Sequence, residues 1–141
     1  MTETVSLDDL VERDGLFYKK FTDVPFSGQV TGEWNGEIQE GTKEGTWKTY
    51  HENGRLRDKA HYKDGQKDGL SEYYRENGKL LGKVHDKDGK QDGLEESYYE
   101  NGQLKSKGHF KDGERDGLRE TYFENGQLER KATYKNGIKI D

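Results

Sequence analysis

The sequence contains no cysteine, a single proline and few apolar residues. Without cysteine there is no disulfide framework, no thiolate metal site and no cysteine nucleophile. The sequence also lacks an apolar run of about 18 residues and a basic N-terminal segment followed by an apolar one, so we expect neither a transmembrane helix nor a secretory signal. Together with the absence of cysteine, this predicts a cytoplasmic protein.

Apolar residues make up 27% of the 141 residues and charged residues 38%, a mixture that is typical of disordered chains. The nineteen glycines and nine tyrosines argue for order, because they recur at fixed spacings, whereas disordered segments are usually poor in aromatics. So few apolar residues cannot line two packed faces. We therefore expect a thin sheet with little or no second layer.

The chain repeats itself every 24 residues, in units that start at Gly45, Gly69, Gly93 and Gly117. Each unit reads Gly-Leu (Gly-Thr in the first), a stretch centred on Tyr, Glu-Asn-Gly, Leu, a Lys-rich stretch, and an aromatic before Lys-Asp-Gly or Lys-Asn-Gly. Asn-Gly and Asp-Gly supply the positive φ that tight hairpins require. The pattern predicts an all-β fold: an elongated, single-layer, antiparallel array of β-hairpins.

The segment before the full units differs from them. Residues 1–27 are rich in large apolar side chains, with Ser6 and Asp9 spaced to cap a short helical turn. We expect this segment to form an N-terminal cap with one hairpin, and residues 28–44 to form a shortened repeat. Four repeats would follow (45–68, 69–92, 93–116 and 117–141), and the whole chain would be one continuous domain.

Side chains alternate between the two faces of a strand, which sorts each unit. On one face of the third unit we place Leu94, Glu96, Tyr98, Leu104, Ser106, Gly108 and Phe110. The opposite face would carry Tyr73, Arg75, Lys83, His85, Ser97, Tyr99, Lys107, His109, Phe123 and Lys131. The assignment depends on whether the Asn-Gly turns have two residues or three with a bulge, because a one-residue shift exchanges the faces.

Two motifs, the run from Gly93 to Leu104 and the Phe-Lys-Asp-Gly of residues 110–113, resemble the bacterial variant of the MORN repeat. Phe17-Tyr18 and the segment 24–28 resemble the start of proteins in that group, so the resemblance spans roughly residues 10 to 137. Such proteins are often described as antitoxins or immunity proteins, which implies binding and neutralising a partner rather than catalysis. Eukaryotic MORN arrays are associated with scaffolding and lipid binding, but most units here have Leu instead of an aromatic after the first Gly, which weakens the lipid inference.

A histidine column, formed by His61, His85 and His109, suggests a metal site at first sight. Adjacent units of a hairpin array are separated by two strand spacings, which is about 10 Å. The ligands of one zinc ion each lie only about 2 Å from the metal, so these histidines cannot share an ion. We predict no metal and no cofactor.

A glutamate column, formed by Glu72, Glu96 and Glu120, resembles the paired carboxylates of hydrolases. The spacing of about 10 Å exceeds the ~5 to 9.5 Å that glycosidases use, and a single-layer sheet has no dry cleft to raise the pKa of one carboxyl. Pairing with lysine across strands, as in Glu95 with Lys107, is the simpler role. We predict no catalytic residue and no enzymatic activity.

A lysine column, formed by Lys59, Lys83, Lys107 and Lys131, raises the alternative of nucleic-acid binding. The formal net charge is −5 and acidic residues are interleaved throughout, so we expect no long-range positive field and no nucleic-acid partner. The inverse idea stays open: regularly spaced aspartates could imitate a polyanion and occupy a basic partner. These aspartates are Asp64, Asp68, Asp88, Asp92, Asp112 and Asp116.

An extended ribbon without an enclosed pocket is suited to recognise another macromolecule, and we expect a protein partner, either a toxin or another effector. Its anchors would be exposed aromatic and arginine side chains: Trp34, Trp47, Tyr73, Arg75, Tyr99 and Phe123. Alternatively, these side chains stack on their neighbours and stiffen the ribbon. The leading hypothesis is a non-catalytic inhibitor of the antitoxin or immunity type. The alternative is a scaffold that self-associates through its sheet edges or organises other proteins. Binding to a lipid surface has the least support.

Overall fold

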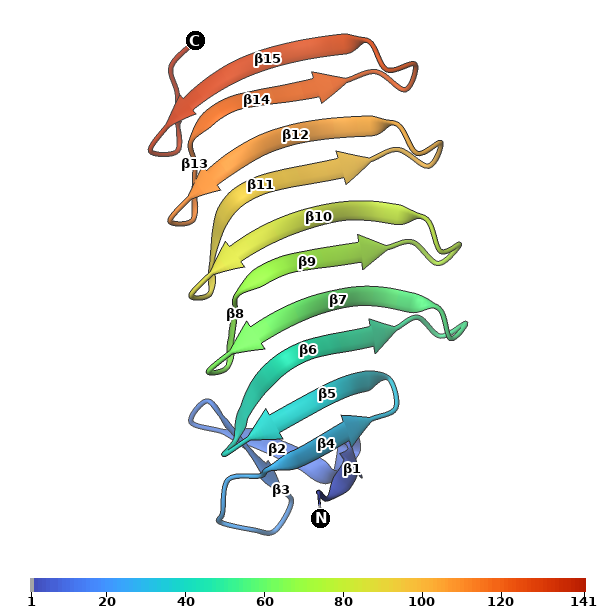
Figure 1. Ribbon diagram of the computed structural model, residues 1–141, viewed down its shortest axis with the longest axis vertical. Helices are drawn as coiled ribbons and strands as arrows, with labels where there is room; N and C mark the ends of the chain where they lie inside the picture. The colour runs from blue at the N-terminus through green and yellow to red at the C-terminus, as the bar shows by residue number, and fades with distance from the viewer. Residues whose placement is uncertain (1) are drawn as a thin grey trace.

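The computed structural model describes residues 2–141, which form a long ribbon of hairpins stacked in chain order (Figure 1). One 14-stranded sheet runs through the whole length, and a two-stranded sheet lies beside its N-terminal end. Within these residues the helical element is a short 3-10 turn, η1 (Leu7–Asp9). The predicted all-β, single-layer hairpin array is confirmed.

The strands follow a simple order. In the large sheet the order is β1-β4-β5-β6-β7-β9-β10-β11-β12-β14-β15-β16, with β8 and β13 as short additions on β7 and β12, while β2 and β3 form the second sheet. The bounds are β1 (Thr4–Ser6), β2 (Leu10–Arg13), β3 (Leu16–Lys19), β4 (Gly28–Thr31), β5 (Trp34–Gln39), β6 (Thr42–Tyr50), β7 (Leu56–Lys63), β8 (Gln66–Lys67), β9 (Gly69–Tyr74), β10 (Leu80–Lys87), β11 (Lys90–Tyr98), β12 (Leu104–Lys111), β13 (Glu114–Arg115), β14 (Gly117–Tyr122), β15 (Leu128–Lys135) and β16 (Ile138–Lys139).

The first strand departs from the expected antiparallel pattern, because β1 pairs in parallel with β4. Parallel neighbours need a crossover connection, which η1 and the β2–β3 hairpin supply here. The backbone N–H of Ser6 donates a hydrogen bond to Asp9 Oδ2 at 3.0 Å, so the capped turn forms as expected. The N-terminal segment thus both extends the sheet and folds over its end.

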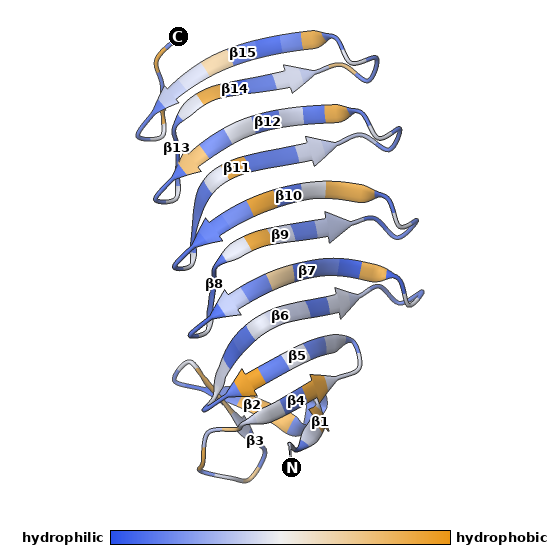
Figure 2. Cartoon of the chain, viewed as in Figure 1, coloured by the Kyte–Doolittle hydropathy of each residue, from blue (hydrophilic) through white to orange (hydrophobic). Residues whose placement is uncertain are grey.

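The hydrophobic core lies at this N-terminal end (Figure 1). Its buried side chains come from β1, β2, β4, β5, β6 and the segment before β4: Val5, Leu10, Phe26, Val30, Ile38 and Trp47. Along the repeats, Figure 2 shows hydrophobic residues as separate bands on otherwise polar strands. The repeats are therefore stabilised mainly by contacts between neighbouring hairpins.

Two kinds of glycine turn alternate along the ribbon. Between hairpins, Asp64 and Gly65 both have positive φ (51° and 81°), which is the two-residue turn whose twist matches the flanking strands. Within a hairpin, Gly54 has φ of 85° and its N–H donates to His51 O at 2.9 Å, while the His51 N–H donates to Arg55 O at 2.8 Å. The Asn-Gly loops are thus the longer kind, with a left-handed glycine closing the turn.

A β-bulge follows each Asn-Gly loop, and it changes which side chains share a face. In the third repeat Tyr98 pairs with Leu104, but Ser97 pairs with Ser106, so Lys105 is the extra residue. Directly opposite residues share a face, so Ser106 lies with Ser97 rather than with Tyr98. The predicted face assignment is therefore correct for Leu104 but wrong for the part of the second strand after the bulge, because simple alternation has no place for an inserted residue.

We call one side of the sheet the small-residue face, after the side chains along its middle: Ala60, Ser71, Gly82, Ser97, Ser106, Gly108 and Ala132. These positions are mostly buried although no second layer covers them. Longer neighbours lean across: a Cβ on Gly108 would lie 3.1 Å from Nη1 of Arg119. Small side chains thus let a single sheet shield its own backbone.

The other side, which we call the Glu–Lys face, carries a row of alternating charge. Directly opposite residues along the row are Glu72, Lys83, Glu96, Lys107, Glu120 and Lys131. Such cross-strand pairs contribute about 0.2–1 kcal/mol each. The predicted pairing of Glu95 with Lys107 is wrong by one residue, because Glu95 lies opposite Gly108 on the small-residue face.

Gly36 provides a test of the N-terminal core. A Cβ at this position would overlap the indole ring of Trp47, which packs directly on the Gly36 backbone. We expect Gly36→Ala to lower the free energy of unfolding by about 1–3 kcal/mol, as overpacking does.

Urea denaturation would measure this loss, and Gly108→Ala is the matched control. The neighbour of Gly108 is the flexible end of Arg119, which can move, so the control should change stability by less than about 1 kcal/mol. Equal losses in the two variants would contradict the packing role of Gly36.

Candidate partner-binding surface

One variable position in each repeat holds neighbouring repeats together. It follows the column tyrosine and is occupied by His51, Arg75, Tyr99 and Phe123. The first three bind the backbone carbonyl of the column tyrosine in the next repeat. The bonds are His51 Nε2 to Tyr74 O at 2.9 Å, Arg75 Nη2 to Tyr98 O at 2.9 Å, and Tyr99 Oη to Tyr122 O at 2.6 Å. The polar ends of two predicted anchors, Arg75 and Tyr99, are thus used within the ribbon.

Phe123 occupies the same position in the fourth repeat, and its side chain has no hydrogen-bonding atom. It is 49% exposed. Among residues 2–141 there is no fifth column tyrosine whose carbonyl this position could bind. Among the predicted anchors it is the one whose ring is most open to solvent.

The loop asparagines make a second set of hydrogen bonds between repeats, which the sequence analysis did not predict. Asn53 Nδ2 donates to Glu76 O at 2.7 Å and Asn101 Nδ2 donates to Glu124 O at 3.0 Å. The Asn side-chain oxygen also accepts from the backbone of its own loop, as in Arg55 N to Asn53 Oδ1 at 2.9 Å. Because these asparagines were already explained by turn formation, their recurrence gave no separate signal for contacts between repeats.

The two tryptophans belong to the N-terminal core region. Trp47 is 3% exposed, and its Nε1 donates to Glu37 O at 3.1 Å, so its ring offers a partner almost no surface. We therefore assign Trp47 a structural role in place of the expected partner contact. Trp34 is half-buried, with Lys43 Nζ 4.3 Å from the centre of its ring. Burial lowers the pKa of Lys43, and the nearby positive charge of Lys67 lowers it further.

Tyr73 lies on the small-residue face, opposite Gly82 and Asp58. Lys67 Nζ donates a hydrogen bond to Tyr73 Oη at 3.0 Å. Tyr73 is half-buried, and this hydrogen bond holds its hydroxyl in place.

The glutamate column on the Glu–Lys face has a structural partner. In three repeats the column tyrosine donates its hydroxyl to the glutamate two residues earlier: Tyr74 to Glu72 at 3.1 Å, Tyr98 to Glu96 at 3.2 Å, and Tyr122 to Glu120 at 3.0 Å. Burial raises the pKa of Tyr98, and the charge of Glu96 raises it further. These glutamates thus act as hydrogen-bond acceptors along a strand.

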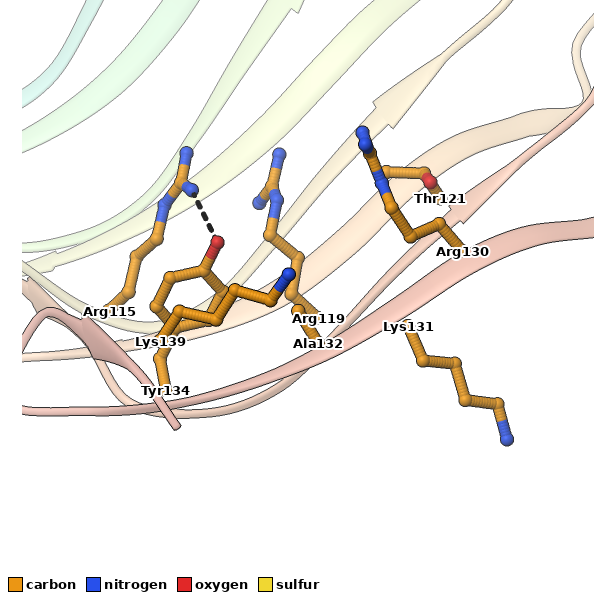
Figure 3. Close-up of a pocket in the computed structure, with 8 residues that line it drawn as sticks. All are labelled: Arg115, Arg119, Thr121, Arg130, Lys131, Ala132, Tyr134 and Lys139. Atoms are coloured by element: carbon orange, nitrogen blue, oxygen red, sulfur yellow. Dashed lines mark hydrogen bonds between the residues drawn. The ribbon is translucent and has the colours of Figure 1, made fainter. Parts of the chain in front are cut away.

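The small-residue face is hollowed where long side chains surround the serines, glycines and alanines. A hollow of about 340 Å³ lies over the last repeat, lined by Arg115, Arg119, Thr121, Arg130, Lys131, Ala132, Tyr134 and Lys139 (Figure 3). A second hollow of about 400 Å³ adjoins it and includes Ser97, Tyr99 and Ser106. This face therefore offers shallow, polar recesses to a partner rather than an enclosed cavity.

Two further properties bear on function. Across residues 2–141, no group of three or more His, Asp or Glu side chains is arranged to hold a metal ion. In the same range, no helix has the length and apolar character needed to cross a membrane.

A family model described as the MORN repeat variant matches residues 43–64, 67–85, 91–112 and 115–136, together more than half of the chain. The chain belongs to the MORN repeat variant family. The four matched segments coincide with the hairpins β6–β7, β9–β10, β11–β12 and β14–β15. MORN repeat proteins are typically non-catalytic binding proteins, so this chain is a repeat protein of a binding family.

Other comparisons add little. A search of curated proteins found no significant match. Among solved structures, one similar chain comes from the crystal structure of accessory secretory protein 1, 2 and 3 in Streptococcus pneumoniae, with 16% identity and a TM-score of 0.41. The alignment covers 86% of this MORN chain and 21% of that chain, so the MORN chain corresponds to about a fifth of the length of its structural neighbour.

The hydrogen bonds between repeats predict that two similar substitutions change the free energy of unfolding by different amounts. Tyr99→Phe removes the donor to Tyr122 O and should lower the free energy of unfolding by about 0.5–1.5 kcal/mol. Phe123→Tyr adds a hydroxyl where no next repeat provides a carbonyl, so it should be nearly neutral. Guanidinium chloride unfolding of both variants and the wild type tests the pair; equal stabilities for Tyr99→Phe and the wild type would contradict the role of Tyr99.

Stability at high pH should depend on the column tyrosines. Because the folded state raises the pKa of Tyr98, the unfolded chain loses that proton first. The stabilising contribution is therefore present below about pH 10, the ordinary pKa of tyrosine, and is lost as pH rises toward the folded-state pKa. Tyr98→Phe should reduce the fall in unfolding free energy between pH 9 and 11, and an unchanged slope in this variant would refute the effect.

Proposed function

We propose that this MORN protein is a non-catalytic inhibitor that neutralises a partner protein by direct binding, in the manner of a bacterial cytoplasmic antitoxin or immunity protein. The observation that carries the proposal is the shape of the small-residue face: an open, hollowed surface lined by tyrosine and arginine side chains along the last two repeats. Such residues dominate the binding energy of protein interfaces. A toxin or another effector protein is the proposed partner.

The contact residues are the predicted anchors that keep exposed surface. Phe123 presents an open ring. Tyr73 and Tyr99 present half-buried rings whose hydroxyls are already held, by Lys67 and by Tyr122 O. Rings fixed in this way lose little conformational entropy on binding, which favours affinity.

Arg75 and Trp34 complete the proposed contact surface at its edges. Arg75 is anchored through one guanidinium nitrogen to Tyr98 O, and its Nε is buried without a hydrogen-bond partner among residues 2–141. Trp34 contributes part of one ring beside Lys43. Arginine and tryptophan are both enriched among interface hot spots.

Affinity capture tests the proposal. The tagged wild-type protein, incubated with lysate of its own cells, should retain one stoichiometric protein partner. Phe123→Ala should reduce the retained partner about fivefold or more, the loss expected for a hot-spot residue above 1 kcal/mol. Phe21→Ala is the matched control, since Phe21 is another exposed phenylalanine but lies in the loop after β3.

Retention of no protein above the level of an untagged control would argue strongly against an inhibitor. So would equal loss of the partner in the Phe123→Ala and Phe21→Ala variants, because the binding surface would then lie elsewhere. Enzymatic turnover by the isolated chain would remove the non-catalytic part of the proposal.

The second candidate function is a self-associating scaffold, which one feature favours. The sheet ends in the short strand β16, where Ile138 is 67% exposed and Ile140 is 60% exposed. Open sheet edges with apolar side chains can pair with a second copy. Light scattering at high protein concentration separates the two candidates, because a strictly monomeric protein would exclude the self-associating scaffold.

Binding to a lipid surface has weaker support, since the net charge of −5 disfavours contact with anionic lipids.

A further inference from the structure

The hollow over the last repeat is strongly basic in a chain whose net charge is negative. Figure 3 shows the side chains of Arg115, Arg119, Arg130 and Lys139 on the same side of the sheet, whereas the ammonium group of Lys131 points away from them. We call these four residues the basic cluster. No carboxylate is among the residues that line this hollow.

The repeats themselves do not require these arginines. The position of Arg119 is occupied by Trp47, Ser71 and Glu95 in the preceding repeats, and the position of Arg130 by Asp58, Gly82 and Ser106. The earlier repeats fold as the same hairpins without an arginine at either position. Arg119 and Arg130 are therefore specific to the last repeat and are not needed for the hairpin array to fold, whereas Arg115 and Lys139 continue a column that holds Lys43 and Lys67 in earlier units.

The polar groups in the hollow are incompletely paired. The side chain of Arg119 is only 20% exposed, and its nearest carboxylate is Glu95 Oε1 at 3.7 Å from Nη1. Among the described residues, Arg119 Nη1 and Thr121 Oγ1 are buried without a hydrogen-bond partner. Arg115 Nη1 reaches only the hydroxyl of Tyr134, at 3.4 Å. Buried donors without acceptors are costly, so an acceptor that enters the hollow would be bound favourably.

Carboxylates match this arrangement. A guanidinium group binds a carboxylate with two parallel hydrogen bonds, and several arginines in one recess can hold two neighbouring carboxylates. The adjoining hollow shares Arg119, Thr121 and Arg130, and adds the hydroxyls of Ser97 and Ser106 together with Lys105 and the carboxylates of Glu95 and Glu129, so the acidic side chains would bind in the first hollow rather than in this one. These groups suit the backbone of a short segment that continues beyond its acidic side chains.

The charge of the whole chain favours a local acidic segment over an extended polyanion. A nucleic acid or an anionic membrane would meet the acidic turns along the ribbon as well as the basic cluster, and the net charge of −5 would repel it. At physiological salt, interactions beyond about 8 Å are largely screened, so a few carboxylates inside the hollow would sense mainly the nearby cations.

We propose that the basic cluster over the last repeat binds the carboxylates of an acidic segment of the protein partner. The inference rests on the proposed function and specifies one contact of it. Arg119 and Thr121 hold the buried end of the bound segment, and Arg115, Arg130 and Lys139 surround its carboxylates. The exposed ring of Phe123 belongs to the same repeat.

A peptide titration tests the inference without the natural partner. The probe is a blocked hexapeptide, Gly-Glu-Asp-Glu-Asp-Gly, added to the full-length ¹⁵N-labelled protein and followed by ¹H–¹⁵N correlation NMR at constant ionic strength. Saturable shift changes should cluster at the amides of Thr121 and Ala132 and at the side-chain Nε of Arg119. The amide peptide Gly-Gln-Asn-Gln-Asn-Gly should produce none.

Two adjacent residues of β15 provide a matched pair of variants. Arg130→Gln should weaken peptide binding about threefold to tenfold, because it removes one cation from the hollow. Lys131→Gln removes the same charge from the opposite side of the same strand, and should change the affinity by less than about 1.5-fold. Both side chains are exposed, so both variants should fold, which the same spectra report directly.

Several outcomes would overturn the inference. In the titration, shift changes that are absent or scattered over the protein would do so, as would equal binding of the amide peptide. So would an equal loss of peptide affinity in the Lys131→Gln and Arg130→Gln variants. Tighter binding of inorganic pyrophosphate than of the acidic peptide would indicate a phosphate-bearing ligand instead. In the capture experiment, full retention of the partner by Arg130→Gln would also overturn it while leaving the proposed function intact. If the wild type captures no partner, the proposed function is wrong. The peptide titration then still tests whether the basic cluster binds carboxylates.

Discussion

The structure depends on one constraint: a sheet without a second layer must obtain its stability from the hairpins beside each strand. The backbone hydrogen bonds of the ladder supply the continuous part of this contact. Side chains add a second set of bonds that cross from one repeat to the next, as when Tyr99 donates to the carbonyl of Tyr122. Because each bond links positions in consecutive repeats, the 24-residue period is itself a condition of stability.

The lack of a second layer also explains why the two faces of the sheet carry different side chains. On the Glu–Lys face, charge alternates along a row, and in three repeats the column tyrosine donates a hydrogen bond to a glutamate. On the small-residue face, serine, glycine and alanine let long neighbours lean over the sheet, which creates shallow hollows. Ser71 Oγ, Arg119 Nη1 and Thr121 Oγ1 of this face are buried without a hydrogen-bond partner among residues 2–141, and this is the face on which we propose that the partner binds.

The two ends of the ribbon differ in how the edge of the sheet is covered. At the N-terminus, the parallel strand β1, the β2–β3 hairpin and a buried cluster around Trp47 cover the last exposed edge with apolar contacts. At the C-terminus there is no comparable cover: the position used for bonds between repeats holds Phe123, and two central positions hold arginines.

Much of the fold could be predicted from residues that act locally, whereas the candidate site could be predicted only in part. Phe123 was recognised as an exposed aromatic, but Arg75 and Tyr99 have an additional role that requires the next repeat to be in place. Trp47 appeared to be an anchor because aromatic type alone does not reveal burial. The basic cluster was missed because its members lie on β13, β14, β15 and β16 and come together only in the folded sheet.

The sequence by itself determined the period, the hairpins and the positions of the turns, because positive φ at Asp-Gly and Asn-Gly is a local property of those residues. Only the tertiary structure decided which side chains share a face. The bulge after each Asn-Gly loop inserts one residue, and its effect depends on the register with the opposite strand, which is a non-local property.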